Sequence, residues 1–198
     1  MSTETTDRQK LTYEDYALIP EDGCQHEIID GEHYVNPAPS TYHQAVSRRL
    51  QFLLYAQIEL AKRGVVINAP YDVQLFKHDI LQPDLVVVLK DRQHIITHSR
   101  IEGTPDLVVE ILSQSTATRD RKLKRATYQK AGVLEYWIVA PFEQKVEQLV
   151  LQDGIYKPLP PGNHLELTII ENVTVRLENV WQETTHPYAI TADNTLNC

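Results

Sequence analysis

The chain has 198 residues, of which 42% are hydrophobic and 23% are charged, and its formal net charge at pH 7 is −8. This composition is typical of a globular protein that is long enough to bury a substantial core. The acidic balance argues against tight nonspecific binding of nucleic acid through bulk charge. No apolar run approaches the roughly 20 residues that a membrane-spanning helix needs, so we expect no membrane association.

The ends of the chain and its cysteines suggest where the protein resides. The N-terminal segment is polar and lacks the apolar core of a signal peptide. The two cysteines, Cys24 and Cys198, provide neither a disulfide framework nor a zinc site by themselves. We therefore expect a cytoplasmic protein, with flexible ends at 1–10 and 183–198 and a single domain over 11–182.

The first half of the chain alternates helical and extended patterns. In chain order these predict a short helix, a hairpin, a long helix and two stretches of strand: residues 11–20, 25–36, 42–64, 65–76 and 82–89. The hairpin prediction depends on Asp30–Gly31, a dipeptide that favours tight turns. The long helix shows apolar side chains at helical spacing, and Gly64 is its expected end.

The second half predicts a mostly buried strand, a helix, another strand, a hairpin and two short edge strands: residues 104–113, 116–132, 134–141, 145–159, 165–170 and 173–177. The strand–helix–strand unit has the length of a right-handed crossover between neighbouring parallel strands. The predicted fold class is therefore α/β, bordering on α+β. We expect a central mixed sheet flanked by helices, with an N-terminal hairpin and a C-terminal ribbon.

Glu110 is the first residue that suggests chemistry, because it lies in the middle of an apolar strand pattern. A buried charged side chain is costly unless it is paired or bound to a metal. Strand alternation places Glu110 on the same face as Asp106, Val108 and Leu112. Asp106 lies about 13 Å away along an extended strand, so it cannot share an ion with Glu110. The partner of Glu110 must come from another strand.

Asp84 is the best candidate for that partner, because it directly precedes the apolar run of another predicted strand. If the two strands are neighbours, Asp84 and Glu110 approach each other at one end of the sheet. Two carboxylates and a backbone carbonyl form an oxygen-rich site suited to Mg²⁺ or Mn²⁺. The alternative is that Asp84 caps a turn after Pro83.

A metal site for phosphoryl chemistry also needs a cation to assist the attacking water and to offset developing charge. The position two residues after Glu110 holds the apolar Leu112, but the next predicted helix carries Lys124 on the same stripe as Tyr128. From that stripe, Lys124 can reach back over Glu110. By itself, however, a lysine on a helix is most often a solvated surface residue. We expect solvation for three other basic residues of this helix: Arg121, Lys122 and Arg125.

Two residues of the N-terminal third have both a structural and a functional interpretation. Glu27 lies in the predicted hairpin, where a glutamate is usually solvated, and is a further candidate for the site. His43 lies at the start of the long helix. It is either a residue of the N-terminal turn or a site residue, and we favour the structural role.

Several stretches, taken in order, resemble a known family: "LTYEDYALIPEDG…HEIIDGEHYVNPAPSTYHQ", "QPDLVVV", "GTPDLVVEILSQSTATRDRKLKRATYQKAGVLEYWIVAP" and "DGIYKPL". Together they are similar to the Uma-type "putative restriction endonuclease" family over residues 11–159. The resemblance implies the restriction-endonuclease-like fold of the PD-(D/E)XK nuclease superfamily. In that superfamily an Asp and a Glu on adjacent strands bind a divalent metal, and a Lys assists the attacking water.

Matched onto this chain, the resemblance implies that Asp84 and Glu110, with the carbonyl of Ile111, bind Mg²⁺ or Mn²⁺. It implies that Lys124 provides the assisting lysine from the helix. Glu27 corresponds best to the early glutamate of the superfamily.

Two functions are consistent with these residues. The first is a metal-dependent endonuclease that hydrolyses DNA phosphodiester bonds, expected as a homodimer because cutting both strands needs two sites. The alternative is a catalytically silent module that keeps the nuclease fold and binds nucleic acid or a protein partner. The acidic net charge favours the alternative, because a duplex binder normally has a basic face. The presence of Asp84, Glu110 and Lys124 together favours the enzyme.

Overall fold

The computed structural model describes residues 9–113 and 120–181. Residues 1–8 of the predicted N-terminal segment and the predicted tail 183–198 lie outside this part of the chain. Residues 116–119, the predicted start of the second long helix, also lie outside it.

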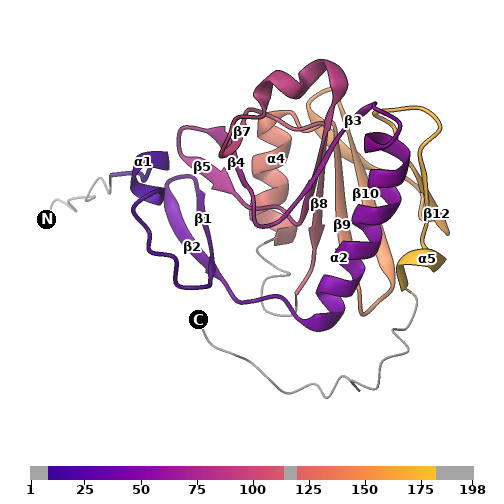
Figure 1. The fold of residues 1–198 in the computed structure, drawn as a ribbon, viewed down its shortest axis with the longest axis horizontal. Helices are drawn as coiled ribbons and strands as arrows, with labels where there is room; N and C mark the ends of the chain where they lie inside the picture. Colours follow the sequence, from indigo (N-terminus) through magenta and orange to yellow (C-terminus); the bar gives the residue numbers. More distant parts are fainter. Residues whose placement is uncertain (1–8, 114–119, 182–198) are drawn as a thin grey trace, which may run out of the picture.

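A mixed sheet forms the centre of the described part of the chain (Figure 1), with six strands in the order β11–β10–β9–β8–β6–β3. Its strands are β3 (Gly64–Asn68), β6 (Leu85–Leu89), β8 (Leu107–Ile111), β9 (Glu135–Ala140), β10 (Lys145–Gln152) and β11 (Ile155–Pro158). β8 and β9 run parallel, as the predicted strand–helix–strand crossover requires, whereas β6 runs antiparallel to β8. The mixed sheet of the predicted fold class is therefore confirmed.

A second sheet within the described residues has five strands in the order β2–β1–β5–β4–β7. These are β1 (Gln25–Ile29), β2 (Glu32–Asn36), β4 (Asp72–Phe76), β5 (Asp79–Leu81) and β7 (Arg100–Glu102). β1 and β2 form the predicted hairpin, with Asp30 and Gly31 at positive φ angles of 52° and 80°. The predicted strand stretch 65–76 is divided between the two sheets, because Pro70 cannot donate a ladder hydrogen bond and interrupts it.

Two further strands, β12 (His164–Glu166) and β13 (Thr174–Arg176), pair with each other in antiparallel fashion. They confirm the predicted C-terminal ribbon. β5 and β7 did not emerge from the sequence patterns, because strands of three residues are too short for alternation to be recognised.

The helices of the described residues are α1 (Tyr13–Tyr16), α2 (Thr41–Leu54), α4 (Arg125–Ala131) and α5 (Glu178–Trp181). Three helical segments of other types accompany them: the π-helices η1 (Tyr55–Glu59) and η3 (Asp120–Lys124), and the 3-10 helix η2 (Lys90–Ile95). The prediction that Gly64 ends the long helix was wrong, because Gly64 begins β3. A Cβ at Gly64 would lie 2.7 Å from the Val88 carbonyl oxygen, so the close approach to β6 requires a glycine there.

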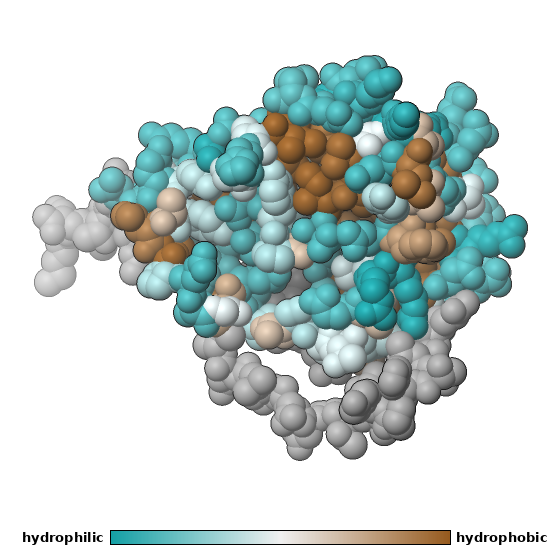
Figure 2. Space-filling model, viewed as in Figure 1, coloured by the Kyte–Doolittle hydropathy of each residue, from teal (hydrophilic) through white to brown (hydrophobic). Residues whose placement is uncertain are grey.

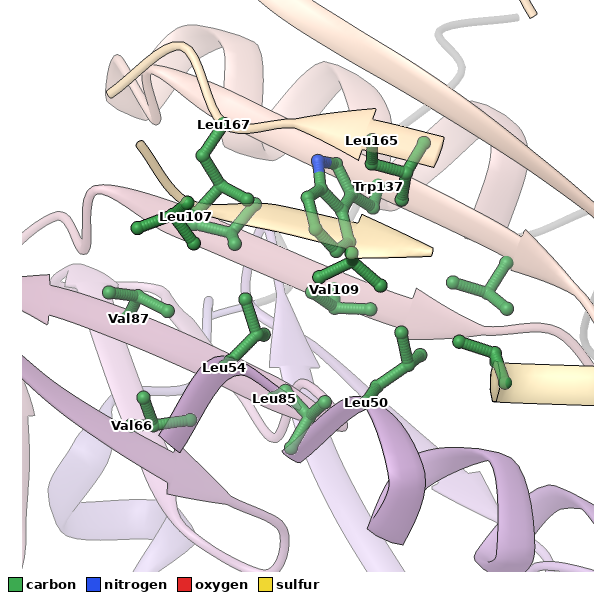
Figure 3. Packing of buried hydrophobic residues seen from close by; sticks show 14 of the residues in the cluster. Leu50, Leu54, Val66, Leu85, Val87, Leu107, Val109, Trp137, Leu165 and Leu167 are labelled. Carbon is green, nitrogen blue, oxygen red and sulfur yellow. The ribbon is translucent and has the colours of Figure 1, made fainter. Parts of the chain in front are cut away.

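Alternation along the central strands separates two apolar cores. On one face, Leu50 and Leu54 of α2 pack with Val109 in a cluster that also includes the C-terminal ribbon (Figure 3). On the other face, Val108 and Tyr128 belong to a cluster formed with the second sheet and α4. Because Glu110 has the same strand parity as Val108, its side chain lies on the α4 side of the sheet.

The surface view in Figure 2 is mostly hydrophilic, with apolar side chains in separate patches. Within 9–113 and 120–181, no helix is both long enough and apolar enough to span a membrane.

Candidate functional site

Glu110 is the centre of a buried polar cluster on the α4 side of the central sheet. Glu110 is 4% exposed. Lys124 Nζ lies 3.0 Å from its Oε1 and 3.1 Å from its Oε2, and the Tyr128 hydroxyl donates to Oε1 at 2.6 Å. The sequence-based expectation that Lys124 reaches back over Glu110 agrees with this geometry.

Glu27 joins the same cluster from β1 of the second sheet and is fully buried. Its Oε1 lies 2.9 Å from Lys124 Nζ and accepts the backbone N–H of Gln82 at 2.9 Å. Its Oε2 accepts the side-chain amide of Asn36 at 2.8 Å. Lys124 therefore links two carboxylates that come from different sheets. The usual solvated position of a hairpin glutamate does not apply here.

The environment of the cluster shifts the pKa values of two of its members. Burial by itself raises the pKa of Glu27, but the nearby Lys124 ammonium and the hydrogen bonds to the carboxylate outweigh it, so the pKa is lowered. Burial, together with the nearby Glu110 carboxylate, raises the pKa of Tyr128 well above its usual value. Tyr128 therefore stays a neutral hydrogen-bond donor, and Glu27 stays ionised.

Local helical structure brings Lys124 and Tyr128 to the same side. Lys124 is the last residue of the π-helix η3, and Tyr128 follows four residues later on α4. Residues separated by four positions lie on one face of a helix, and short π-helical segments are frequent at functional sites. Gly132, in the left-handed conformation with φ 82°, ends α4 and returns the chain toward β9.

Asp84 lies at the other side of Glu110, just before β6. The register pairs Leu85 with Val109, so Asp84 is directly across from Glu110, as expected for neighbouring strands. Asp84 Oδ2 accepts the backbone N–H of Ile111 at 2.7 Å. Asp84 therefore contacts β8, and a turn-capping role after Pro83 does not by itself describe its position.

His43 of α2 contacts the same end of β8. Its Nε2 lies 3.0 Å from the Ile111 carbonyl oxygen and 3.4 Å from Asp84 Oδ1. Sequence reasoning left His43 either as a residue of the N-terminal turn or as a site residue, and favoured the structural role. One signal was present: His43 shares the core-facing stripe of α2 with Val46 and Leu50, which are both buried.

Asp106 and Leu112 take no part in this cluster. Asp106 is buried, accepts the backbone N–H of Leu89 at 2.8 Å and pairs with Arg92 at 2.7 Å. It therefore organises the start of β8, in agreement with its expected position. Leu112 packs in the second apolar core. The cluster also includes Asn36 and the backbone N–H of Gln82, which no sequence pattern indicated.

The donor set near Asp84 is compatible with a divalent cation. Asp84 Oδ1 and the Ile111 carbonyl oxygen both lie within 3.4 Å of the same atom, His43 Nε2. Oxygen ligands of this kind suit Mg²⁺ or Mn²⁺. Within the described ranges, no three His, Cys, Asp or Glu residues form a metal-binding group. A metal site here therefore needs the backbone carbonyl, and Glu110 would share its oxygens between Lys124 and the ion.

A groove of about 720 Å³ opens beside this end of the sheet, and Asp84 and Gln82 are part of its lining. α1 contributes Tyr13 and Tyr16, whereas the exposed side of α2 contributes Arg48 and other polar residues. The groove connects Asp84 to solvent, so an extended molecule bound in it would lie next to this carboxylate.

Comparisons with known proteins agree with this architecture. The model of the Uma2 family, described as "Putative restriction endonuclease", matches residues 13–180. The chain is also similar to a solved crystal structure of a putative nuclease belonging to DUF820 from Anabaena variabilis ATCC 29413. That likeness has a TM-score of 0.69 and 18% sequence identity, and it covers 86% of this chain and 97% of the other. At this identity the likeness shows the fold. No curated protein matches the chain.

Proposed function

Because the chain belongs to the Uma2 family of putative restriction endonucleases, we propose that it is a nuclease that hydrolyses DNA with the help of a divalent metal ion. The observation that carries the proposal is the convergence of Glu27 and Glu110 on Lys124, with Asp84 directly across from Glu110 on the neighbouring strand. These charged groups come from two sheets and a helix. Of the four, only Asp84 lines the groove.

The charge of the cluster supports a role for a cation. The three carboxylates and the single ammonium leave a formal charge of −2. Uncompensated charge in a low-dielectric interior is unfavourable, and a divalent ion would neutralise it. Hydrogen bonds from Tyr128 and Asn36 compensate part of this charge without removing it.

In the proposed reaction, Asp84, Glu110 and the Ile111 carbonyl would hold Mg²⁺ or Mn²⁺. The bound ion would polarise the scissile phosphate and lower the pKa of a coordinated water. Lys124 would orient the attacking water and offset negative charge that develops on the phosphate. Glu27 would hold Lys124 in place through their 2.9 Å contact.

The surroundings offer positions for a DNA strand. The groove lined by Asp84 and Arg48 would hold the strand next to the Asp84 carboxylate. Arg121 and Lys122 are exposed on η3, within one turn of Lys124, where they would contact phosphates. Cleavage of both strands needs two sites, so the proposal includes a homodimer, which light scattering in solution would detect.

The test is cleavage of supercoiled, linear and single-stranded DNA by the full chain with Mg²⁺ or Mn²⁺. We expect cleavage by the native chain and a loss of at least about 100-fold in Asp84→Asn and Glu110→Gln. Glu166→Gln changes an exposed glutamate of β12 and is the matched control. Cleavage by Glu110→Gln at the rate of this control would disprove the proposal.

One observation favours the alternative of a catalytically silent binding module. Both oxygens of Glu110 already contact Lys124, and Oε1 also accepts the Tyr128 hydroxyl. A cluster that satisfies its own charges in this way can be structural. Calorimetric titration separates the two functions, because a silent module would bind DNA or a protein without detectable affinity for Mn²⁺.

A further inference from the structure

His43 contacts two of the proposed metal ligands, although the proposed reaction gives it no role. Its Nε2 lies 3.0 Å from the Ile111 carbonyl oxygen and 3.4 Å from Asp84 Oδ1. The side chains of His43 and Asp84 are 12% and 14% exposed, so the contacts are largely shielded from solvent. Packing of α2 against the sheet needs an apolar surface at this position. It does not need a ring nitrogen directed at two oxygen atoms.

These separations are close to those between neighbouring ligands of one metal ion. Ligands that are each about 2.1 Å from a six-coordinate ion, at right angles to one another, lie about 3 Å apart. The measured separations from Nε2 are 3.0 and 3.4 Å. In this structure Nε2 donates a hydrogen bond to the Ile111 carbonyl oxygen, so binding an ion requires the ring to lose that hydrogen and the three atoms to turn toward the ion. Their separations can remain close to the present ones while they do so.

The position of His43 is also well defined by the fold. Ser40 caps α2, and its hydroxyl oxygen accepts the backbone N–H of His43 at 3.2 Å. Val46 and Leu50 follow on the same stripe and are completely buried in the core. A ligand on a capped helix with a packed face is held more precisely than one on a loop.

We propose that His43 is a nitrogen ligand of the metal ion, and that it makes the site prefer Mn²⁺ to Mg²⁺. This proposal rests on the proposed function and specifies which ion the same site takes. Mg²⁺ strongly prefers oxygen ligands, whereas an imidazole nitrogen is a better ligand for transition-metal ions. In the metal-bound form, Nε2 would direct its lone pair at the ion and the ring hydrogen would reside on Nδ1.

The test uses the full chain loaded with Mn²⁺, and it needs no enzymatic activity. Electron spin-echo spectroscopy detects coupling between the Mn²⁺ electron spin and a directly bound nitrogen nucleus. We expect this coupling in the native chain, its loss in His43→Gln, and its retention in His164→Gln, which changes an exposed histidine of β12. Calorimetry should show Mn²⁺ affinity reduced about tenfold or more in His43→Gln, and Mg²⁺ affinity reduced less than about threefold.

If His43→Gln does not fold, the native chain labelled with a different nitrogen isotope in its histidines replaces the variant. The coupling must then change to that of the new isotope. A second outcome is that Mn²⁺ binds to the native chain, is lost in Asp84→Asn, and shows no nitrogen coupling. This outcome would overturn the role of His43 and leave the proposed nuclease intact. Equal losses of Mn²⁺ and Mg²⁺ affinity in His43→Gln would overturn the preference.

The outcome for the proposed function is separate. Nitrogen coupling in a sample that cleaves no form of DNA would contradict the nuclease and leave the metal ligand in place. A native chain that binds no Mn²⁺ would overturn the His43 proposal together with the metal dependence of the nuclease.

Discussion

Lys124 and Glu110 form a buried ion pair in which Nζ contacts both carboxylate oxygens, at 3.0 and 3.1 Å. Fourteen positions separate them in the chain, and the crossover from β8 to α4 brings them together. Because the same ammonium also contacts Glu27, a single side chain links the second sheet, the central sheet and α4. Stability and proposed activity therefore depend on the same contact, and measurements that separate the two are informative.

The first prediction concerns Lys124→Met. This change leaves Glu27 and Glu110 buried without their cation, which typically costs about 3–5 kcal/mol of unfolding free energy. In the folded chain the pKa of Glu27 is lowered from its ordinary value of 4.5. The ionised Glu27 therefore stabilises the fold above about pH 4.5, and this stabilisation is lost as the pH falls through the lowered pKa of the folded chain. The deficit of the variant should therefore be largest near pH 7 and should narrow below about pH 4.5.

Urea unfolding of the native chain and the variant at a series of pH values measures this deficit. Lys122→Met is the matched control, because Lys122 is an exposed lysine on the same π-helix. We expect it to change stability by less than about 0.5 kcal/mol at every pH. A deficit of Lys124→Met that stays constant with pH would contradict the assigned ion pair.

The second prediction compares two buried tyrosines. The Tyr128 hydroxyl donates to the Glu110 carboxylate at 2.6 Å, whereas the Tyr156 hydroxyl donates to the Val133 carbonyl at 2.9 Å. Hydrogen bonds to charged groups contribute about 1.5–3 kcal/mol, and those between neutral groups about 0.5–1.5 kcal/mol. Tyr128→Phe should therefore lower the unfolding free energy more than Tyr156→Phe.

Chemical denaturation of both variants at pH 7 gives the comparison, and DNA cleavage adds a second readout. Tyr128→Phe should also reduce cleavage, because Glu110 loses a partner that orients it, whereas Tyr156→Phe should not. Equal losses of stability in the two variants would indicate that Glu110 does not carry a charge in the folded chain.

The third prediction separates a structural buried glutamate from the site. Glu135 is completely buried and accepts the side-chain N–H groups of Trp137 and Gln148 at 2.6 and 2.7 Å. Its second oxygen accepts the backbone N–H and the hydroxyl of Thr168, at 2.7 and 2.6 Å. Glu135→Gln replaces one acceptor with a donor in this network, and it should destabilise the chain by about 1–3 kcal/mol.

The folded fraction of Glu135→Gln should keep native Mn²⁺ affinity and native cleavage, whereas Glu110→Gln should lose both. Calorimetry and cleavage assays below the unfolding transition of each variant provide the measurement. Weakened Mn²⁺ binding in Glu135→Gln would mean that the carboxylate cluster is not confined to Glu27, Asp84 and Glu110.

Much of the fold and part of the site follow from local patterns in the sequence. The Asp30–Gly31 dipeptide predicted the β1–β2 hairpin, and the length of the β8–α4–β9 unit predicted the parallel pair. Alternation along β8 placed Glu110 on the face that α4 covers. These signals depend on neighbouring residues alone, so they are readable without tertiary structure.

Other features of the site come from segments that no local pattern connects. The burial of Glu27 requires the second sheet to pack over the central one, and the contact of His43 with Ile111 requires α2 to lie at the end of β8. Neither packing arrangement has a signature in the spacing of residues along the chain. The division of 65–76 between two sheets is different, because Pro70 marks the interruption in the sequence itself.

The sequence by itself therefore determined the order in which most helices and strands follow one another along the chain, and the face of β8 on which Glu110 lies, because both depend on backbone periodicity. It indicated Lys124 as a partner of Glu110, but it did not determine that Glu27 joins them or that His43 lies beside Asp84. Residues of β1 and α2 reach the site only when the cores on both sides of the sheet are packed. The tertiary structure alone decided that one lysine contacts two buried carboxylates and that His43 contacts Asp84 and Ile111.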